Sequence, residues 1–319
     1  MNKTGFYTHP SCLLHEMGNG HPECPDRLNA IYDRFLMTGL DIGLENIQAG
    51  PAAMSDLELA HAKMYIASLR GLSDQLLDDI TAGGPSYAQV DPDTSMNSHT
   101  WSAIQHAAGA ALEATDAVIA GDLQNAFCAV RPPGHHARRE RAGGFCFVNN
   151  VAVAAKHALD RHGLKRVAVV DFDVHHGDGT QDILHCDERV LMVSIYQHPF
   201  YPEGGAGDIT ERMVNVPIAA YTKGDAVRQV VTDYWIPALH DHQPEMIFIS
   251  AGFDAHREDD MGQIGLLESD YAWITRQIKA IATTYAKGRI VSVLEGGYNT
   301  QALAKSVEAH VRVLADLGV

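Results

Sequence analysis

The sequence predicts an α/β protein built on a central, mostly parallel β-sheet flanked by helices. Short, continuously apolar runs alternate along the chain with longer segments of helical periodicity. Continuous apolar runs are typical of strands covered on both faces, and their alternation with helices is typical of parallel sheets. With 319 residues, 46% of them hydrophobic, the chain is long enough to bury a large core. It contains no internal repeat or linker, so we expect a single domain over residues 1–319.

Five apolar runs are expected to be strands, at residues 126–130, 167–170, 190–195, 246–250 and 290–294. Apolar residues recur at helical spacing around and between these runs, which predicts helices at about 98–120, 149–162, 225–240, 268–286 and 301–317. Three histidines, His106, His157 and His162, fall within these helical patterns, and we interpret them as surface or core histidines.

The composition argues against several classes of protein. A formal net charge of −16 disfavours a nucleic-acid binder, although it aids solubility and would attract cationic substrates. The five cysteines form no CxxC pair, so neither a disulfide framework nor a cysteine zinc site fits, and we expect a reducing compartment. We identify no signal peptide and no apolar run of membrane-spanning length, which predicts a cytoplasmic protein that does not bind membranes.

Polar and aromatic residues follow every expected strand. These segments are residues 131–136, 171–179, 196–202, 251–256 and 295–298. In open parallel sheets the ligand site lies at the carboxyl ends of the strands. The five segments should therefore converge on one rim, where we expect an active site.

The segment DFDVHHGDG at 171–179 predicts a metal site. Alternate residues of an extended chain project the same way, so Asp173 and His175 can hold one ion, and Asp254 is our third ligand. Mixed oxygen and nitrogen ligands suit zinc or another divalent transition metal, and three protein ligands leave a position for water. Asp254 could instead cap a turn or helix, and His256 is the nearest rival ligand.

Three further side chains are candidates for the chemistry. His135 and His136 follow a Pro-Pro-Gly sequence whose irregular backbone would let both reach one site, with Asp171 and Asp178 available to orient them. Tyr298 follows two glycines, and its hydroxyl could donate to a developing oxyanion. The alternatives are a solvated histidine turn and a packed aromatic residue.

Two aromatic residues, Phe145 and Tyr201, lie beside the polar motifs in the sequence. They could wall a narrow channel that grips an apolar stem. They could equally be core residues, and the pattern alone does not distinguish the two interpretations.

Together these motifs resemble the histone deacetylase family, and most closely its class II-like and bacterial members, including acetylpolyamine amidohydrolases. The matching stretches are RPPGHHA (131–137), GGFCFVNNVAVAA (143–155), DFDVHHGDGT (171–180), GFDAH (252–256) and LEGGYN (294–299). HPECPDRL (21–28) resembles an early loop of the family, in which Arg27 would help to order the site. The resemblance extends from about residue 5 to residue 310.

The resemblance implies the single-domain arginase–deacetylase fold, with a sheet of about eight strands. It implies one zinc ion held by Asp173, His175 and Asp254. It also implies a catalytic pair, His135 and His136, backed by Asp171 and Asp178 respectively, and Tyr298 as the group that polarises the acyl carbonyl.

The resemblance further implies a substrate channel and a structural potassium ion. The channel would be flanked by Gly144, Phe145 and Tyr201. The potassium would be lined, partly through backbone carbonyls, by Asp171, Asp173, His175, Ser194 and Ile195. A second, more peripheral potassium is less certain.

The sequence departs from the family pattern in two places. Glu203 and the glycines up to residue 207 follow Pro202 where we expect a glycine, so the rim loop should differ in shape or charge. Met261 occupies the position that carries a glutamate gatekeeper in polyamine-specific relatives. Because methionine cannot pair with an ammonium group, this favours acyl-lysine or another amide as substrate.

We therefore predict a zinc-dependent amidohydrolase that removes acetyl or other acyl groups from lysine side chains or similar amines and binds hydroxamates. His136 is the preferred base and acid and His135 the electrostatic partner, although the sequence does not separate them. The alternatives are an acetylpolyamine deacetylase, an arginase-like ureohydrolase and a non-catalytic acyl-lysine binder. An arginase-like site needs carboxylates at positions 177 and 256, where Gly177 and His256 stand. The sequence does not determine the substrate, the length of its acyl group, the identity of the metal (zinc or iron) or whether the chain forms a homo-oligomer.

Overall fold

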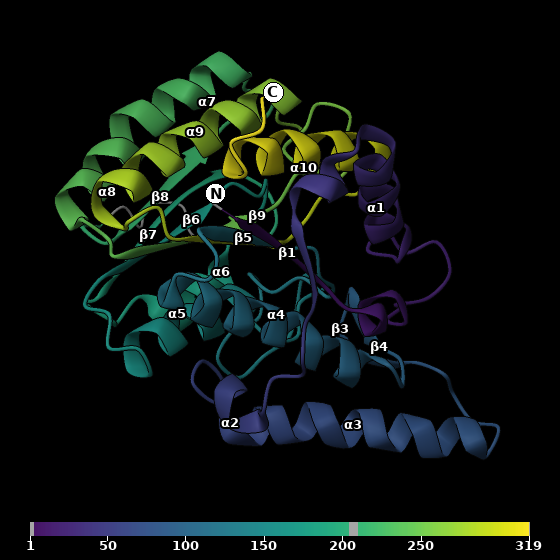
Figure 1. The fold of residues 1–319 in the computed structure, drawn as a ribbon. Helices are drawn as coiled ribbons and strands as arrows, with labels where there is room; N and C mark the ends of the chain where they lie inside the picture. The colour runs from purple at the N-terminus through teal and green to yellow at the C-terminus, as the bar shows by residue number, and fades with distance from the viewer. Residues whose placement is uncertain (1–2, 204–209, 319) are drawn as a thin grey trace.

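Eight parallel strands form the central sheet of the computed structural model, which describes residues 3–203 and 210–318. Their spatial order is β2-β1-β5-β10-β9-β6-β7-β8. Figure 1 shows the sheet between two layers of helices. Their bounds are β1 Thr4–Thr8, β2 Glu45–Gln48, β5 Asn125–Cys128, β6 Val167–Asp171, β7 Val190–Gln197, β8 Met213–Ile218, β9 Met246–Ala251 and β10 Ile290–Leu294. A separate antiparallel hairpin pairs β3, Ala88–Asp91, with β4, Thr94–Met96.

The five strands predicted from the sequence are consecutive neighbours in this sheet, from β5 to β7. Every residue of these strands is buried, as their continuous apolar sequence predicts. Asp171 at the end of β6 lies beside Ser194 of β7 on one side and Ser250 of β9 on the other. Because all pairs are parallel, the carboxyl ends of the strands lie along one edge and bring the polar segments together.

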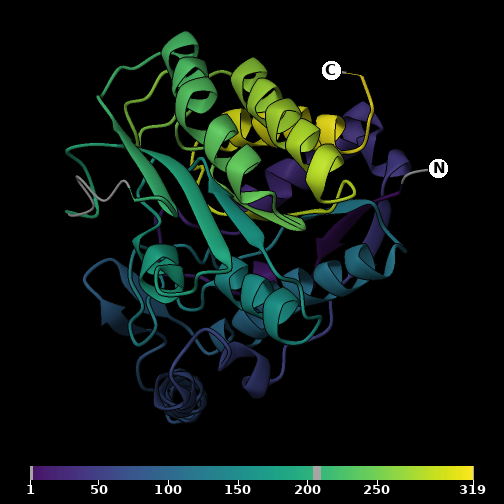
Figure 2. The same ribbon diagram turned by 90° about the vertical axis from the view of Figure 1, so that its left-hand side faces the viewer.

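Helices cover both faces of the sheet, as the two views show (Figures 1 and 2). One face carries α4, Thr100–Ala120, α5, Asn150–Asp160, and α6, Asp178–Leu184, with α2, Met54–Leu57, and α3, Lys63–Thr81, further out. The other face carries α1, Asp26–Thr38, α7, Gly224–Val230, α8, Ile236–His242, α9, Glu268–Tyr285, and α10, Thr300–Leu314. The result is the predicted α/β architecture with helices on both sides of a parallel sheet.

Two helix starts are fixed by side chains next to the polar edge. The side chain of Asn149 accepts from Ala152 N at 2.9 Å and begins α5, while its Nδ2 donates to Thr180 Oγ1 at 2.9 Å. Asn299 accepts from Ala302 N at 3.0 Å and begins α10. Each cap therefore anchors the loop that precedes it, and both loops contribute to the site below.

The sequence analysis missed three strands of the sheet, and each lacks a continuous apolar run. β2 is an edge strand with mostly exposed polar residues. The opposite edge, β8, is interrupted by Asn215 and Pro217, and a proline is tolerated because an edge strand leaves some N–H positions unpaired. β1 mixes Thr and Gly with its aromatic residues. The segment predicted as one helix at 225–240 consists of α7, a wider π-type turn at Val231–Trp235, and α8.

Within the described parts of the chain, no helix combines the length and the apolar character needed to cross a bilayer.

Candidate active site

Asp173, His175 and Asp254 meet in a buried cluster at the ends of β6 and β9. His175 Nδ1 lies 3.0 Å from Asp173 Oδ1 and 3.1 Å from Asp254 Oδ2. Backbone N–H groups hold the carboxylates in place, since Val174 N donates to Asp254 Oδ1 and Gly296 N to Asp173 Oδ2, each at 2.9 Å. Asp173 and His175, alternate residues of one segment, therefore face one point together with Asp254 from the end of the neighbouring strand.

The chemistry of this donor set fits a divalent transition metal. One ligand atom from each of the three side chains lies within 4.8 Å of the others, and all three residues are buried. Burial and the neighbouring Asp173 carboxylate raise the pKa of Asp254 to about 7, because two carboxylates crowd one dry space. A cation bound between them would relieve that repulsion, and two oxygens with one imidazole nitrogen match zinc.

The adjacent histidines each pair with a carboxylate. His135 Nδ1 lies 3.0 Å from Asp171 Oδ2, and His136 Nδ1 lies 2.7 Å from Asp178 Oδ1. Asp178 is itself fixed by Arg138, whose Nε and terminal nitrogen donate to Oδ2 at 3.0 and 2.7 Å. The two imidazoles lie with ring centroids 4.1 Å apart, which places the pair beside one another as the irregular Pro-Pro-Gly backbone suggested.

The two imidazoles differ in their electrostatic surroundings. Burial, reinforced by the charge of the neighbouring His135, lowers the pKa of His136 to about 4, although Asp178 opposes the shift. Burial also opposes the charge on His135, but the carboxylates of Asp173 and Asp171 outweigh it and hold its pKa well above the usual range. The pair therefore combines one neutral and one charged imidazole near neutral pH.

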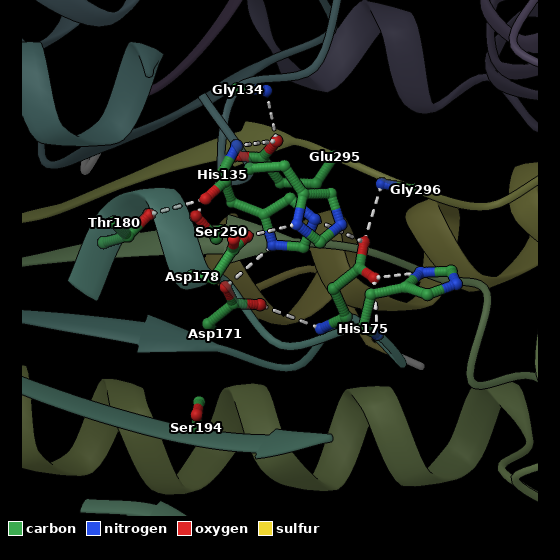
Figure 3. A network of polar contacts seen from close by, with 12 residues as sticks. Gly134, His135, Asp171, His175, Asp178, Thr180, Ser194, Ser250, Glu295 and Gly296 are labelled. Atoms are coloured by element: carbon green, nitrogen blue, oxygen red, sulfur yellow. Dashed lines mark hydrogen bonds and ion pairs between the residues drawn. The ribbon is translucent and has the colours of Figure 1, made fainter. Parts of the chain in front are cut away.

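Glu295 fixes the loop that carries the histidines. Its buried carboxylate accepts from Gly134 N at 2.6 Å and from His135 N at 3.1 Å through Oε2 (Figure 3). Its other oxygen accepts from Ser250 Oγ at 3.1 Å. Burial raises the pKa of Glu295 to about 7, against the charge of His135 and the two N–H donors. One side chain thus links β10, β9 and the histidine loop.

Tyr298 lies on the loop between β10 and α10 and is held from two sides. Its backbone N–H and that of Asn299 donate to Asp259 Oδ2 at 2.6 and 2.8 Å. The guanidinium of Arg27 lies 5.0 Å from the ring centroid, and its Nε donates to the backbone carbonyl of Gly297 at 2.7 Å. Burial raises the pKa of Tyr298 well above its usual value, although Arg27 opposes the shift, so the hydroxyl keeps its proton and can donate.

A cavity of about 350 Å³ leads to the cluster. Phe200 stacks on His175 with ring centroids 5.4 Å apart, and Tyr201 lies edge-on to His136 at 5.2 Å. His136 lines the cavity, and His135 is not among its lining residues. The lining is Asp93, His136, Gly144, Phe145, His175, Phe200, Tyr201, Asp260, Met261 and Tyr298. All four residues predicted for the channel therefore surround one hollow.

Two glycines make this packing possible. A Cβ at Gly296 would overlap the carboxylates of Asp254 and Asp173, lying 2.6 Å from Asp173 Oδ2. At Gly144, where φ is +53°, a Cβ would overlap the ring of His136. Any larger residue at either position would displace a functional side chain.

The residues predicted to line a potassium ion lie on the neighbouring strand ends. Ser194 and Ile195 belong to β7, and Ser194 is the register partner of Asp171. Ser194 Oγ donates to Asn215 Oδ1 at 2.8 Å, and its carbonyl accepts from the Trp235 indole at 3.2 Å. A carbonyl oxygen has a second lone pair, so this hydrogen bond leaves it able to bind a cation.

Two other sequence expectations have separate outcomes. His256, the rival ligand, lies apart from the cluster, and its Nε2 is 3.7 Å from Glu268 Oε2. The glycine-rich part of the predicted rim loop, residues 204–209, lies outside the described residues.

Several residues at the site had been assigned no role from the sequence. Glu295 and Phe200 lie within segments that the sequence analysis singled out. The residue type alone, a single carboxylate or a second aromatic ring, does not predict which groups each of them contacts. Asp259 and Asp260 belong to a charged run that would normally be solvated. Asp93 comes from the turn between β3 and β4, which no pattern connected to this edge.

Comparison with known proteins agrees with this geometry. Residues 21–314 match the histone deacetylase domain. The chain is 35% identical to the histone deacetylase-like amidohydrolase of Pseudomonas aeruginosa, over 93% of this chain and 82% of that protein. It is 37% identical to the polyamine deacetylase HDAC10 of Mus musculus, over 92% of this chain and 44% of that protein.

The fold has a similar counterpart among crystal structures. The HDA15 HD domain superposes with a TM-score of 0.91 at 32% identity, over 99% of this chain and 89% of that one. The predicted arginase–deacetylase fold is thereby confirmed. With this agreement along nearly its whole length, the chain belongs to the histone deacetylase family.

Proposed function

We propose that the protein is a zinc-dependent deacylase that hydrolyses the amide of an acylated lysine side chain or a similar amine. One observation carries this proposal: the Asp173, His175 and Asp254 cluster lies at the cavity that His136 and Tyr298 line. That arrangement combines a metal site, a base and an oxyanion donor around one substrate position. We take residues 1–319 as one catalytic domain.

Asp173, His175 and Asp254 would hold the zinc, which would polarise the acyl carbonyl and lower the pKa of water at the site. His136 takes a proton from the attacking water at Nε2, because its Nδ1 is engaged by Asp178. The same Nε2 then delivers the proton to the leaving amine. The Tyr298 hydroxyl donates to the oxygen on which negative charge develops.

His135 acts on this chemistry without entering the cavity. Its Nδ1 faces Asp171, and its Nε2 lies 3.8 Å from Asp173 Oδ2. A charged imidazole in this position would stabilise negative charge developing at the site. We also propose a structural potassium at Asp171, Asp173, His175, Ser194 and Ile195.

The cavity wall favours an apolar stem ending in an amide. Phe145 and Phe200 contribute aromatic rings, and Met261 contributes an uncharged side chain. The methylene chain of an acyl-lysine would pack against these groups with its amide at the metal. A hydroxamate whose stem matches the length of the acyl-lysine side chain also carries two oxygens that can bind the metal. Such a compound should inhibit hydrolysis.

A polyamine substrate is the second candidate, because two exposed carboxylates, Asp93 and Asp260, also line the cavity. Neither lysine nor arginine lines it among the described residues. An ammonium group beyond the acylated nitrogen would find opposite charge at these positions, which partly offsets the absence of a glutamate at Met261.

A side-by-side assay on metal-quantified protein tests both candidates. An acetyl-lysine peptide, acetylputrescine and acetylspermidine would be compared at equal concentrations, with and without a hydroxamate. We expect hydroxamate-sensitive hydrolysis with the highest kcat/KM on the peptide. A preference for the acetylated polyamines would retain the chemistry and overturn the lysine assignment. Zinc-loaded protein inactive on all three would count against the deacylase itself.

A further inference from the structure

A second group of metal-ligand side chains lies on the helical layer that contains α4 and α5. Asp116 Oδ1 is 2.7 Å from His157 Nε2 and 2.6 Å from His162 Nε2. The two imidazole rings meet edge to face, with centroids 5.1 Å apart. The first turn of α5 follows the active-site segment, and α5 rises roughly 16 Å along its eleven residues, so these histidines at its far end are separate from the cavity.

Helix termination explains why the two histidines meet. His157 belongs to the last turn of α5, and His162 follows the end of that helix. The chain then folds back, with His162 N donating to His157 O at 3.4 Å and Gly163 in the left-handed region at φ +69°. Asp116 reaches both from the neighbouring helix α4. The sequence analysis interpreted His157 and His162 as surface or core histidines, and the structure shows both of them partly exposed and paired with one carboxylate.

The donor set is suited to a transition metal. Two imidazole nitrogens and one carboxylate oxygen, all within 4.8 Å of one another, match the ligands that zinc takes in tetrahedral sites. Ligand atoms around a tetrahedral zinc lie about 3.4 Å apart, so the carboxylate would have to withdraw by less than about 1 Å. The side chain of Asp116 is 52% exposed and has room to do so.

We propose that Asp116, His157 and His162 form a second, peripheral site for a divalent transition metal, with zinc as its test ion. Water would complete the coordination, because Asp116 is on the surface. The ion would join α4 to the end of α5 and so stabilise this layer. This site does not depend on the proposed deacylase function.

The peripheral site should bind more weakly than the buried cluster. His162 and Asp116 are partly open to solvent, whereas all three residues of the active-site cluster are buried. Nδ1 of His157 is buried and, among the described residues, has no hydrogen-bond partner. High-affinity sites usually give that second nitrogen an acceptor, so its lack here lowers the affinity. Chelation should therefore empty the peripheral site first.

The test is a calorimetric titration of zinc into protein that already carries zinc in the buried cluster. Wild type should take up one further equivalent, and His162→Ala and Asp116→Asn should take up none. His240→Ala is the matched control, because His240 is an exposed histidine that contacts Tyr285 outside the cluster. Thermal unfolding gives a second readout, since added zinc should raise the melting temperature of wild type and the control only.

The acyl-lysine hydrolysis rate of His162→Ala should equal that of wild type, which separates this site from the deacylase function. The proposal is overturned if wild type binds no further zinc, or if both cluster variants bind it as wild type does. A failure of the deacylase assay leaves these binding results unaffected, because they are counted in equivalents of zinc and not in turnover.

Discussion

Tyr298 offers the simplest residue-level test, because its hydroxyl is the only group that phenylalanine lacks. Tyr298→Phe should keep the ring packed against Phe145 and Arg27. Loss of one oxyanion donor should reduce kcat roughly 100- to 1,000-fold, or about 2.7–4 kcal/mol. Steady-state kinetics on an acetyl-lysine peptide would measure it.

Zinc content and melting temperature serve as controls for Tyr298→Phe, and both should stay at the wild-type level. Wild-type turnover by this variant would remove Tyr298 from the mechanism. Loss of zinc would mean instead that the hydroxyl supports the metal cluster.

Glu295 gives a second residue-level prediction. Glu295→Leu leaves the buried N–H groups of Gly134 and His135 without their acceptor, which should cost about 2–5 kcal/mol of stability. Glu295→Gln is the matched control, because its carbonyl oxygen can accept both bonds and its NH₂ can donate to Ser250. Urea unfolding and kcat would be measured for both.

For the glutamine variant we expect stability within about 1 kcal/mol of wild type and most of the activity. The leucine variant should keep its zinc. Its kcat should fall by a larger factor than its KM changes, because the histidine loop shifts while the cavity keeps its shape. Equal stability and equal kcat for leucine and glutamine would show that the carboxylate does not position this loop.

At the residue level, the sequence predicted the contacts of side chains whose relative positions are fixed by their spacing within one motif. Asp173 and His175 alternate along one strand end, and the structure brings them to one point with Asp254. Contacts made by a side chain across the fold were not readable in this way. Glu295 reaches the loop that bears His135, 160 residues away in sequence, and the parallel pairing of β5 with β10 brings them together.

At the level of elements, the strands that are buried on both faces were predicted from the sequence, and the strands at the edges of the sheet were not. The central strands are predominantly apolar because helices cover both of their faces, so they were recognisable. The edge strands β2 and β8 carry polar residues or proline, since one side of each has no neighbouring strand. Their sequences therefore lack the signal that identified the others.

Helix α10 provides an element-level prediction through His310. Its Nδ1 lies 2.7 Å from Thr275 Oγ1 of α9, and its Nε2 lies 2.9 Å from Ser292 Oγ of β10. Burial lowers the pKa of His310 to about 3, whereas an unfolded histidine titrates near about 6.5. The neutral form thus joins three elements, and protonation in the folded state is disfavoured.

The sign of the pH effect follows from this depressed pKa. Above about pH 6.5 His310 is neutral in both the folded and the unfolded state, so its contribution to folding stability is fully present. Between about pH 6.5 and 3 the unfolded state binds an extra proton, so stability falls by up to about 1.4 kcal/mol per pH unit. Urea unfolding at several pH values would show a shallower slope for His310→Gln. Equal slopes would mean that His310 protonates without cost.

The charge of the whole molecule predicts a salt effect on substrate capture. With a net charge of −16 and with Asp93 and Asp260 at the cavity, cationic substrates should be steered toward the site. Raising the salt concentration from about 0.03 to about 0.5 M shortens the screening length from roughly 18 to 4 Å. We expect kcat/KM for an acetylated cationic amine to fall several-fold.

An uncharged acyl amide is the control for this salt effect, and its kcat/KM should stay nearly constant. Asp260→Asn should reduce the salt dependence for the cationic substrate without changing hydrolysis of the neutral one. Identical salt profiles for both substrates would show that the acidic surface serves solubility alone.

Removal of the metal should affect the stability of the whole molecule, because the buried cluster joins β6, β9 and the loop after β10. Without a cation, the Asp173 and Asp254 carboxylates repel each other in a dry space. A ligand that binds only the folded state stabilises it by about 2.7 kcal/mol at a hundredfold excess over Kd. Dialysis against a chelator should therefore lower the melting temperature, and added zinc should restore it.

The His162→Ala background isolates this effect from the peripheral site. In that background His175→Ala should abolish the response to zinc, since it removes the imidazole that both carboxylates face. Calorimetric melting of the chelated and zinc-loaded forms would measure the difference. Equal melting temperatures for the chelated and zinc-loaded forms of His162→Ala would mean that the cluster holds no ion that stabilises the fold. The repulsion between the two carboxylates would then have to be relieved by a proton shared between them. Such a result would also remove the basis for placing the catalytic metal at Asp173, His175 and Asp254.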